Sequence, residues 1–138
     1  MSRCKRVTTK DPTGKPNGYL LELDVVGRKT KAYLTVAYPN CFKGYHAHRV
    51  RESNYVCIRG EIKVRQVKRD GVKDTIMNAE QAERLNIPLD TPTAIINEGE
   101  EEAWLINFPD PPYDPWLKDE QIDLATEEEA LEWVRKNS

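Results

Sequence analysis

Lys43-Gly44-Tyr45-His46-Ala47-His48 contains both histidines of the chain, separated by a single residue. Alternate side chains of a β-strand point to the same side, so His46 and His48 would project together into one space. Glu52 follows His48 by four residues, and Gly60 ends the next β-prone run in a turn. The stretch therefore predicts a strand that presents two imidazoles, with a carboxylate nearby, to a common cavity.

Short β-prone runs separated by Gly, Pro, Asn and Asp turns lie on both sides of this stretch. The run 61–67 alternates apolar and polar side chains for most of its length, which is typical of a half-buried strand. The other expected strands are 19–26, 31–38, 45–48, 54–58, 73–77, 84–87, 93–96 and 103–108. Many short strands joined by tight turns predict an all-β barrel or sandwich.

The two ends of the chain are expected to lie outside this barrel. Residues 1–18 are polar and turn-rich, which predicts a loosely held arm or an edge strand. The proline-rich run 109–115 predicts a surface loop. Thr126 and Glu129 have the spacing of a helix capping box, so the chain should end in a helix. We expect one domain over 1–138, with an N-terminal arm at 1–18 and a C-terminal tail and helix at 116–138.

Composition narrows the classes of function. The chain has 138 residues, a formal net charge of −2 and interspersed acidic and basic residues, which argues against nucleic-acid binding. Three cysteines without a CxxC spacing predict neither a disulfide framework nor a zinc ribbon. No apolar run is long enough for a signal peptide or a membrane span, so we expect a cytoplasmic protein with no membrane partner.

The spacing His46-x-His48-x3-Glu52-x7-Gly60 resembles the first motif of the cupin superfamily. In cupins these two histidines and the glutamate point into a β-barrel and often bind a metal. The resemblance implies a double-stranded β-helix, or jelly-roll barrel, to which the capping box adds a short C-terminal helix. Cupins commonly pair through edge strands, which implies a homodimer in which the N-terminal arm crosses to the partner.

The second cupin motif, Pro-x-Gly-x2-His-x3-Asn, is matched only in part. Pro88 and Asn97 fit, whereas Asp90 replaces the glycine and Thr93 replaces the histidine. A neutral hydroxyl is a poor substitute for imidazole at a transition metal. The expected cofactor is therefore none, and the alternative is a divalent transition metal on His46, His48 and Glu52.

Two families of nucleotide-sugar enzymes extend the resemblance. Residues 43–46 resemble the Arg-Gly-x-His segment of dTDP-4-dehydrorhamnose 3,5-epimerases, and residues 43–48 resemble the Arg-Gly-His-His-Ala-His segment of dTDP-sugar 3,4-ketoisomerases. Both are cupin-type enzymes that work without a catalytic metal. The resemblance implies that His46 removes a proton and that Lys43 replaces the arginine as a cation near the substrate. It also implies catalytic roles for His48 and for Tyr113, which lies in a run similar to the epimerase stretch carrying the tyrosine proton donor.

A nucleotide sugar also needs groups that bind its diphosphate. Lys63 and Arg65 share one face of their strand and could grip phosphate oxygens with help from Arg49 or Arg51, although a solvated outer face is the alternative. Glu52 is a candidate for orienting the base. The expected substrate-binding residues are Lys43, Arg49, Arg51, Glu52, Lys63, Arg65 and Asn97.

Three functions follow from these patterns. The first is an epimerase or ketoisomerase in which a histidine removes a proton alpha to the ketone of a 4-keto-6-deoxy nucleotide sugar. The second is a metal-dependent cupin, such as a dioxygenase or a sugar-phosphate isomerase, that uses His46, His48 and Glu52. The third is a non-catalytic sugar-binding cupin.

Overall fold

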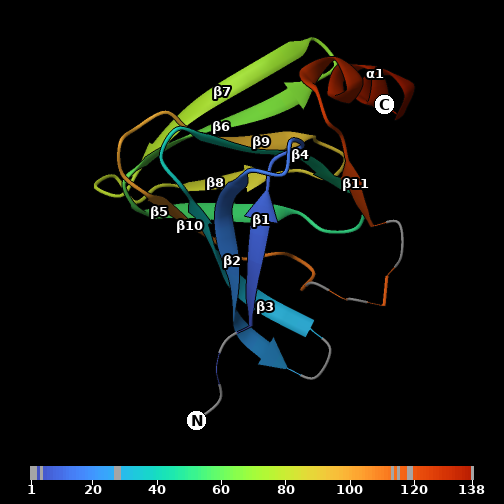
Figure 1. Cartoon of the computed structure of the whole chain (residues 1–138). Coiled ribbons are helices and arrows are strands. Elements are labelled where there is room, and N and C mark those ends of the chain that lie inside the picture. The colour runs from blue at the N-terminus through green and yellow to red at the C-terminus, as the bar shows by residue number, and fades with distance from the viewer. Residues whose placement is uncertain are drawn as a thin grey trace.

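The computed structural model describes residues 3, 5–26, 29–112, 114, 116–117 and 120–137. These residues form β1 (Arg6–Lys10), β2 (Pro16–Val26), β3 (Lys29–Ala37), β4 (Cys41–His48), β5 (Ser53–Arg59), β6 (Glu61–Lys68), β7 (Gly71–Asn78), β8 (Arg84–Ile87), β9 (Thr93–Asn97), β10 (Ala103–Asn107), β11 (Gln121–Asp123) and α1 (Glu127–Asn137). One sheet has the order β1-β2-β3-β10-β5-β8, and the other has the order β11-β4-β9-β6-β7. Figure 1 shows them as the two layers of a barrel, with α1 at one end of the second sheet. The strand-rich barrel expected from the sequence is confirmed.

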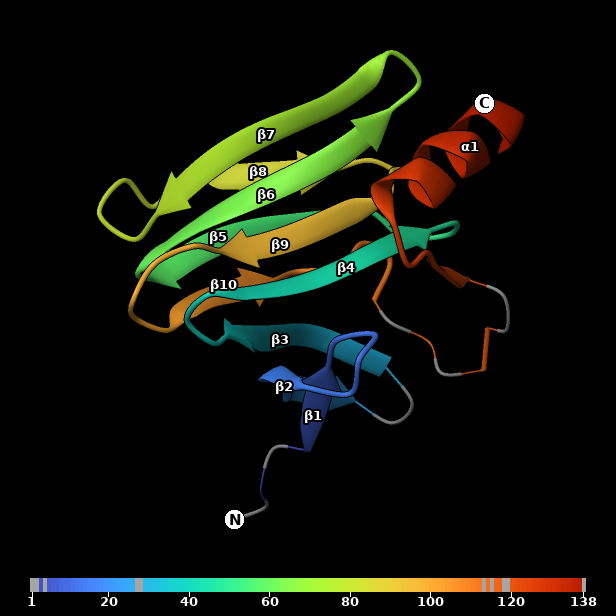
Figure 2. The same cartoon turned by 45° about the horizontal axis from the view of Figure 1, so that its top comes forward.

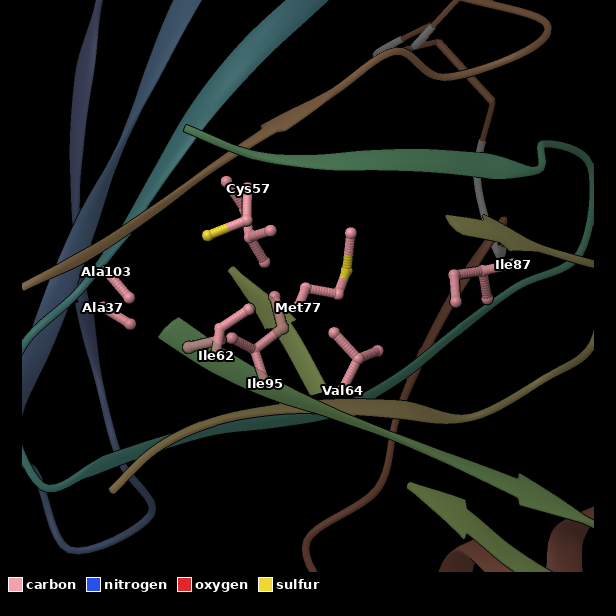
Figure 3. Close-up of a cluster of buried hydrophobic side chains, with 9 residues drawn as sticks. Ala37, Cys57, Ile62, Val64, Met77, Ile87, Ile95 and Ala103 are labelled. Carbon is pink, nitrogen blue, oxygen red and sulfur yellow. The ribbon is translucent and has the colours of Figure 1, made fainter. Parts of the chain in front are cut away.

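The core lies between the two sheets and follows the alternation expected for 61–67. Ile62 and Val64 of β6 point inward and are buried with Cys57, Met77 and Leu105. Figure 3 shows most of this cluster. Each fully buried aliphatic side chain of this size contributes about 1.5–3 kcal/mol relative to an exposed one. The same parity turns Glu61, Lys63 and Arg65 to the outer surface, away from the interior of the barrel.

A β-bulge in β4 decides which of its side chains face the barrel interior. The three residue steps from Lys43 to His46 lie opposite only two steps of β9. The extra residue changes the parity of the strand, so Lys43 lies on the same side as His46 and His48. Gly44, inside the bulge, has φ +144°, and a Cβ there would lie 2.7 Å from the Cα of Ala94. Only glycine fits at this close approach between β4 and β9.

The N-terminal arm forms an edge strand, one of its two expected states. β1 pairs with β2, and β2 pairs with β3, in antiparallel register. Figure 2 shows these three strands extending away from β6 and β7. The inner face of β1, β2 and β3 therefore extends the first sheet away from β6 and β7 of the second sheet.

β11 is a three-residue strand that the sequence did not predict. It pairs with β4 so that Gln121 lies opposite His48, and Asp123 lies opposite His46. Residues separated by more than 70 positions in the chain are thus neighbours on one sheet. The pairing brings new carboxylates to both histidines.

Helix α1 begins where the capping pattern predicts. Thr126 Oγ1 accepts a hydrogen bond from the backbone N–H of Glu129 at 3.1 Å, and Glu129 Oε2 accepts one from the N–H of Ala125 at 3.0 Å. Ala130 and Val134 are buried against the sheet that contains β6. Among the described residues, no helix has the length and the apolar character needed to cross a membrane.

Candidate functional site

A cavity of about 690 Å³ opens between the two sheets. Its volume lies within the range of about 300–1,000 Å³ that is usual for small-molecule sites. The sheet with β4 contributes Lys43, His46 and His48, and the sheet with β3 contributes Tyr33, Tyr55 and Asn107. The structure therefore brings the two histidines and the lysine of the opening sequence stretch into one space.

His46 forms a dyad with Asp123 of β11. Its Nδ1 lies 2.6 Å from Asp123 Oδ1, and Gln121 Nε2 donates a second hydrogen bond to the same oxygen at 2.8 Å. Partial burial raises the pKa of Asp123, but the hydrogen bonds from Gln121 and His46 outweigh it and hold that pKa below its usual range. Asp123 is thus an anion that fixes the ring of His46. With Nδ1 engaged, Nε2 is the ring nitrogen that can take a proton from a bound molecule.

His48 belongs to a different, buried cluster. Its Nδ1 lies 3.3 Å from Glu120 Oε2, and Arg51 Nε lies 3.4 Å from both of those atoms. Burial, together with the positive charge of Arg51, lowers the pKa of His48 to about 4, although Glu120 opposes the shift. His48 is therefore neutral at physiological pH. A neutral, enclosed imidazole is suited to holding its neighbours in place and is a poor proton donor.

Lys43 places an amine inside the cavity wall. Its Nζ lies 3.5 Å from the backbone oxygen of Tyr19, and among the described residues no carboxylate lies within ion-pair distance of it. Burial lowers the pKa of Lys43 to about 8, so most of the amines still carry a proton at pH 7. A Cβ at Gly18 would lie only 3.0 Å from Nζ, so the glycine leaves the room that the amine needs. Such a buried cation can stabilise negative charge on a bound molecule.

Two of the expected phosphate ligands lie outside the cavity. Lys63 Nζ is 2.8 Å from Glu98 Oε1, and Arg65 makes hydrogen bonds of 2.8 and 3.0 Å to the carboxylate of Asp74. Both basic residues are on the outer face of β6, because the alternation that buries the aliphatic residues turns the charged ones outward. The structure thus places this pair on the outer face of the barrel, where each basic residue is bound to a carboxylate.

Three further expected substrate ligands also lie away from the cavity lining. Arg49 pairs with Asp90 at 3.3 Å on the surface. Glu52 accepts a hydrogen bond from Asn86 at 3.4 Å, so it does not orient either histidine. The buried side-chain amide of Asn97 donates to two backbone oxygens and accepts from a third backbone group, which makes it a turn-stabilising residue. Tyr113, the expected proton donor, lies outside the described residues.

The donor groups do not fit a cupin metal centre. Among the described residues, no group of three or more His, Cys, Asp or Glu side chains is arranged to hold a metal ion. Glu52 is not assembled with His46 and His48. The hydroxyl of Thr93, at the position of the missing motif histidine, donates to a backbone oxygen at 2.9 Å. The cation of Arg51 beside His48 further disfavours a second positive charge there.

The residues that sequence reasoning missed lie mostly on or beside β11. Glu120, Gln121 and Asp123 complete the surroundings of the two histidines. The alternation of polar and apolar residues in 121–124 is a weak signal for a short strand. Nothing in that signal identifies β4 as its partner, so the two carboxylates could not be assigned to the histidines from the sequence.

No protein-family model matches this chain, and a search of curated proteins found no relative. Solved structures are similar to it at low sequence identity. The capsular polysaccharide assembling protein CapF from Staphylococcus aureus has a TM-score of 0.70 and 17% identity, over 88% of this chain and 35% of CapF. Oxalate decarboxylase from Lactobacillus farciminis has a TM-score of 0.65 and 18% identity, over 78% of this chain and 31% of that protein.

The cupin domain of Drosophila melanogaster CENP-C has a TM-score of 0.62 and 11% identity, over 76% of this chain and 75% of that domain. This chain spans about a third of the length of CapF. Similarity at these identities concerns the fold. It confirms the jelly-roll barrel that the first motif implied. The C-terminal helix, which the capping box predicted, is present as α1.

Proposed function

We propose that this cupin is an enzyme that moves a proton on the carbon next to the ketone of a 4-keto-6-deoxy nucleotide sugar, as an epimerase or a ketoisomerase. The observation that carries the proposal is the dyad of His46 and Asp123 at the cavity. A histidine whose second nitrogen is held by a carboxylate is the usual arrangement of a general base.

The chemistry assigned to the dyad begins with His46. Its Nε2 takes the proton from the carbon alpha to the ketone, and the electron pair of that bond forms the enolate. Asp123 stabilises the imidazolium that results, since the carboxylate lies 2.6 Å from Nδ1. The enolate oxygen carries the developing negative charge, and Lys43 is a cation of the same cavity that can stabilise it.

The substrate class rests on three supporting observations. The sequence of 43–48 resembles those of the nucleotide-sugar epimerases and ketoisomerases, with His46 in the place of their base. CapF, which shares the fold, is described as a capsular polysaccharide assembling protein, and a sugar-processing role for this chain is consistent with that neighbour. The cavity also has the size for a ligand larger than a free monosaccharide.

The direct test is deuterium exchange in heavy water. We expect the purified protein, with or without prior EDTA treatment, to incorporate deuterium alpha to the ketone of dTDP-4-keto-6-deoxyglucose, as followed by NMR and mass spectrometry. Binding without exchange across a panel of nucleotide sugars would show a non-catalytic sugar-binding protein. Exchange that EDTA abolishes and one added metal restores would show a metal-dependent enzyme instead.

A matched pair of lysine variants checks that the cavity is the site. Lys43→Gln removes the cation inside the cavity, and we expect it to slow exchange by about 10²-fold, the usual cost of losing one group that stabilises an oxyanion. Lys63→Gln removes a cation from the outer face and should leave the exchange rate unchanged. Equal exchange rates for the two variants would show that the reaction does not take place in the cavity that contains Lys43.

A further inference from the structure

The side chain of Lys43 crosses the space between the two sheets. It starts on β4, and its Nζ ends 3.5 Å from the backbone oxygen of Tyr19 on β2. β4 and β2 belong to different sheets. Only 8% of the lysine is exposed, and it lines the cavity that also contains His46. The amine therefore lies buried in the wall of the candidate site.

The surroundings of Lys43 do not neutralise its charge. Over the part of the chain that the structure describes, Nζ has no carboxylate partner, and its hydrogen bond to Tyr19 is long. Lys63 is the opposite case, because its Nζ lies 2.8 Å from Glu98 Oε1 on the outer face of the barrel. A buried and unpaired ammonium group gives up its proton more readily than one in water, which makes its nitrogen a nucleophile.

The same burial determines how much neutral amine is present. It lowers the pKa of Lys43 to about 8. At pH 7 about a tenth of such amines are neutral, against fewer than about one in a thousand for an ordinary lysine. Lys43 is therefore both a cation for most of the time and a nucleophile for a useful part of it.

The sequence places a lysine, and no larger cation, at this position. Both nucleotide-sugar motifs that 43–48 resembles have an arginine where this chain has Lys43. A guanidinium group stays protonated and is no nucleophile, whereas a lysine amine can attack a carbonyl. A Cβ on Gly18 would lie 2.9 Å from Cε and 3.0 Å from Nζ of Lys43, so the glycine leaves the space that the amine occupies.

We propose that Lys43 is a Schiff-base lysine, which condenses with a ketone or an aldehyde bound in the cavity. The lone pair of the neutral amine attacks the carbonyl carbon, and the electron pair of the C=O double bond moves to the oxygen. That oxygen takes two protons from the nitrogen and leaves as water, while a C=N double bond forms. One ammonium group and one carbonyl thus give one iminium ion and one water molecule, and hydrolysis reverses the step.

The use of this step on a 4-keto sugar rests on the proposed function, whereas the condensation itself requires only a carbonyl group. An iminium nitrogen draws electrons from the neighbouring carbon more strongly than a ketone oxygen does. The proton that His46 removes is then more acidic, and its removal leaves a neutral enamine in place of an enolate. The positive charge of Lys43 stays where the noncovalent reaction needs it, but it is now bonded to the substrate.

The test is reductive trapping at pH 7 with sodium cyanoborohydride, which converts an iminium ion into a stable secondary amine. The probes are hydroxyacetone and dTDP-4-keto-6-deoxyglucose. We expect the intact mass to rise by the mass of one probe less one oxygen atom. Peptide mapping should place the adduct on Lys43, with an occupancy at least about tenfold above that on Lys63 of the same molecules.

A variant that keeps the charge and lacks the nucleophile complements the trapping. Lys43→Arg should slow deuterium exchange into the nucleotide sugar by about 10²-fold, and Lys63→Arg should leave it unchanged. Circular dichroism verifies the fold of both variants. Exchange at the wild-type rate in Lys43→Arg would show that positive charge suffices and would overturn the covalent step.

The outcomes separate this inference from the proposed function. Exchange by the wild type without an adduct on Lys43, or with equal occupancy on Lys63, overturns the Schiff base and leaves the proposed function standing. A hydroxyacetone adduct on Lys43 without exchange into the nucleotide sugar supports the Schiff base and removes the proposed substrate. The wild-type peptide map decides the matter even if Lys43→Arg fails to fold.

Discussion

The two histidines of β4 are two residues apart, and both have Nδ1 beside a carboxylate from the segment 120–123, yet their surroundings differ. The side chains of His46 and Asp123 are 46% and 70% exposed. Those of His48 and Glu120 are 15% and 8% exposed. Within the part of the chain that the structure describes, only the second pair has a buried cation beside its carboxylate, namely Arg51 at 3.4 Å.

This contrast shows that two histidines on one strand can have different roles, because their neighbours differ in charge and in exposure. In the exposed pair formed by His46 and Asp123 (the open pair), a proton on His46 completes an ion pair. In the buried cluster of His48, Glu120 and Arg51 (the closed cluster), the charge of Arg51 already balances that of Glu120. A proton on His48 would therefore add an unbalanced positive charge in a buried position. We infer that His46 is the proton carrier and that His48 holds Glu120, and with it the start of β11, against β4.

The change with the largest expected effect removes the negative charge from the open pair. Asp123→Asn should lower the rate of deuterium exchange by about 10²- to 10⁴-fold, because the imidazolium formed on His46 loses the anion that stabilises it. The exchange assay in heavy water measures this directly. A decrease smaller than tenfold would show that Asp123 has no part in the proton transfer.

Glu120→Gln is the matched control in the closed cluster. It leaves the buried Arg51 without the charge of its carboxylate partner, so we expect a loss of about 3 kcal/mol in the free energy of unfolding. Exchange by the protein that remains folded should stay within about tenfold of the wild type. A variant as stable as the wild type would contradict the anchoring role.

The next effect is a dependence of stability on pH that comes from His48. Its pKa is about 4 in the folded chain, against 6.5 for an unperturbed histidine. Between these values the unfolded chain binds a proton that the folded chain does not, so stability falls as the pH falls from 6.5 to 4. The full loss is up to about 3 kcal/mol, and it is absent above the upper value.

Urea unfolding of the wild type and of His48→Gln at pH 7 and pH 4 measures this dependence. The other titrating groups contribute to both proteins, so the difference between the two isolates His48. We expect the stability advantage of the wild type to shrink as the pH is lowered. A difference that does not change with pH would mean that His48 titrates alike in the folded and unfolded chains.

The smallest effect concerns the support of the open pair. Gln121→Ala removes the hydrogen bond that Gln121 donates to Asp123. Because Asp123 is 70% exposed, we expect exchange to slow by about fivefold, or about 1 kcal/mol, the usual net contribution of one hydrogen bond. Steady-state exchange rates at saturating substrate are sufficient to detect it. An effect as large as that of Asp123→Asn would indicate that Gln121 contacts the substrate.

The alternation of side chains along single strands predicted those parts of the site that lie within one strand. The alternation along β4 brought His46 and His48 together, and the alternation along β6 identified its inward residues. The bulge at Gly44 depends on the fit between β4 and β9, which no local pattern reveals. It moves the side chain of Lys43 to the same side of β4 as the two histidines. The position of β11 depends on a pairing across more than 70 residues, so the carboxylate partners of the histidines were not predicted. The charge of Lys63 and its place on a strand suggested a phosphate ligand, but Lys63 forms an ion pair with Glu98 on the outer face of the barrel.

The two single variants His46→Gln and His48→Gln, assayed side by side for deuterium exchange, test the division of roles most directly. Each replaces one imidazole with a neutral amide of similar reach, and each fold can be verified before the assay. We predict that His46→Gln lowers the exchange rate by about 10²-fold or more and that folded His48→Gln keeps it within about tenfold of the wild type. The opposite order, or equal losses in both variants, would contradict the assignment of one base and one anchor.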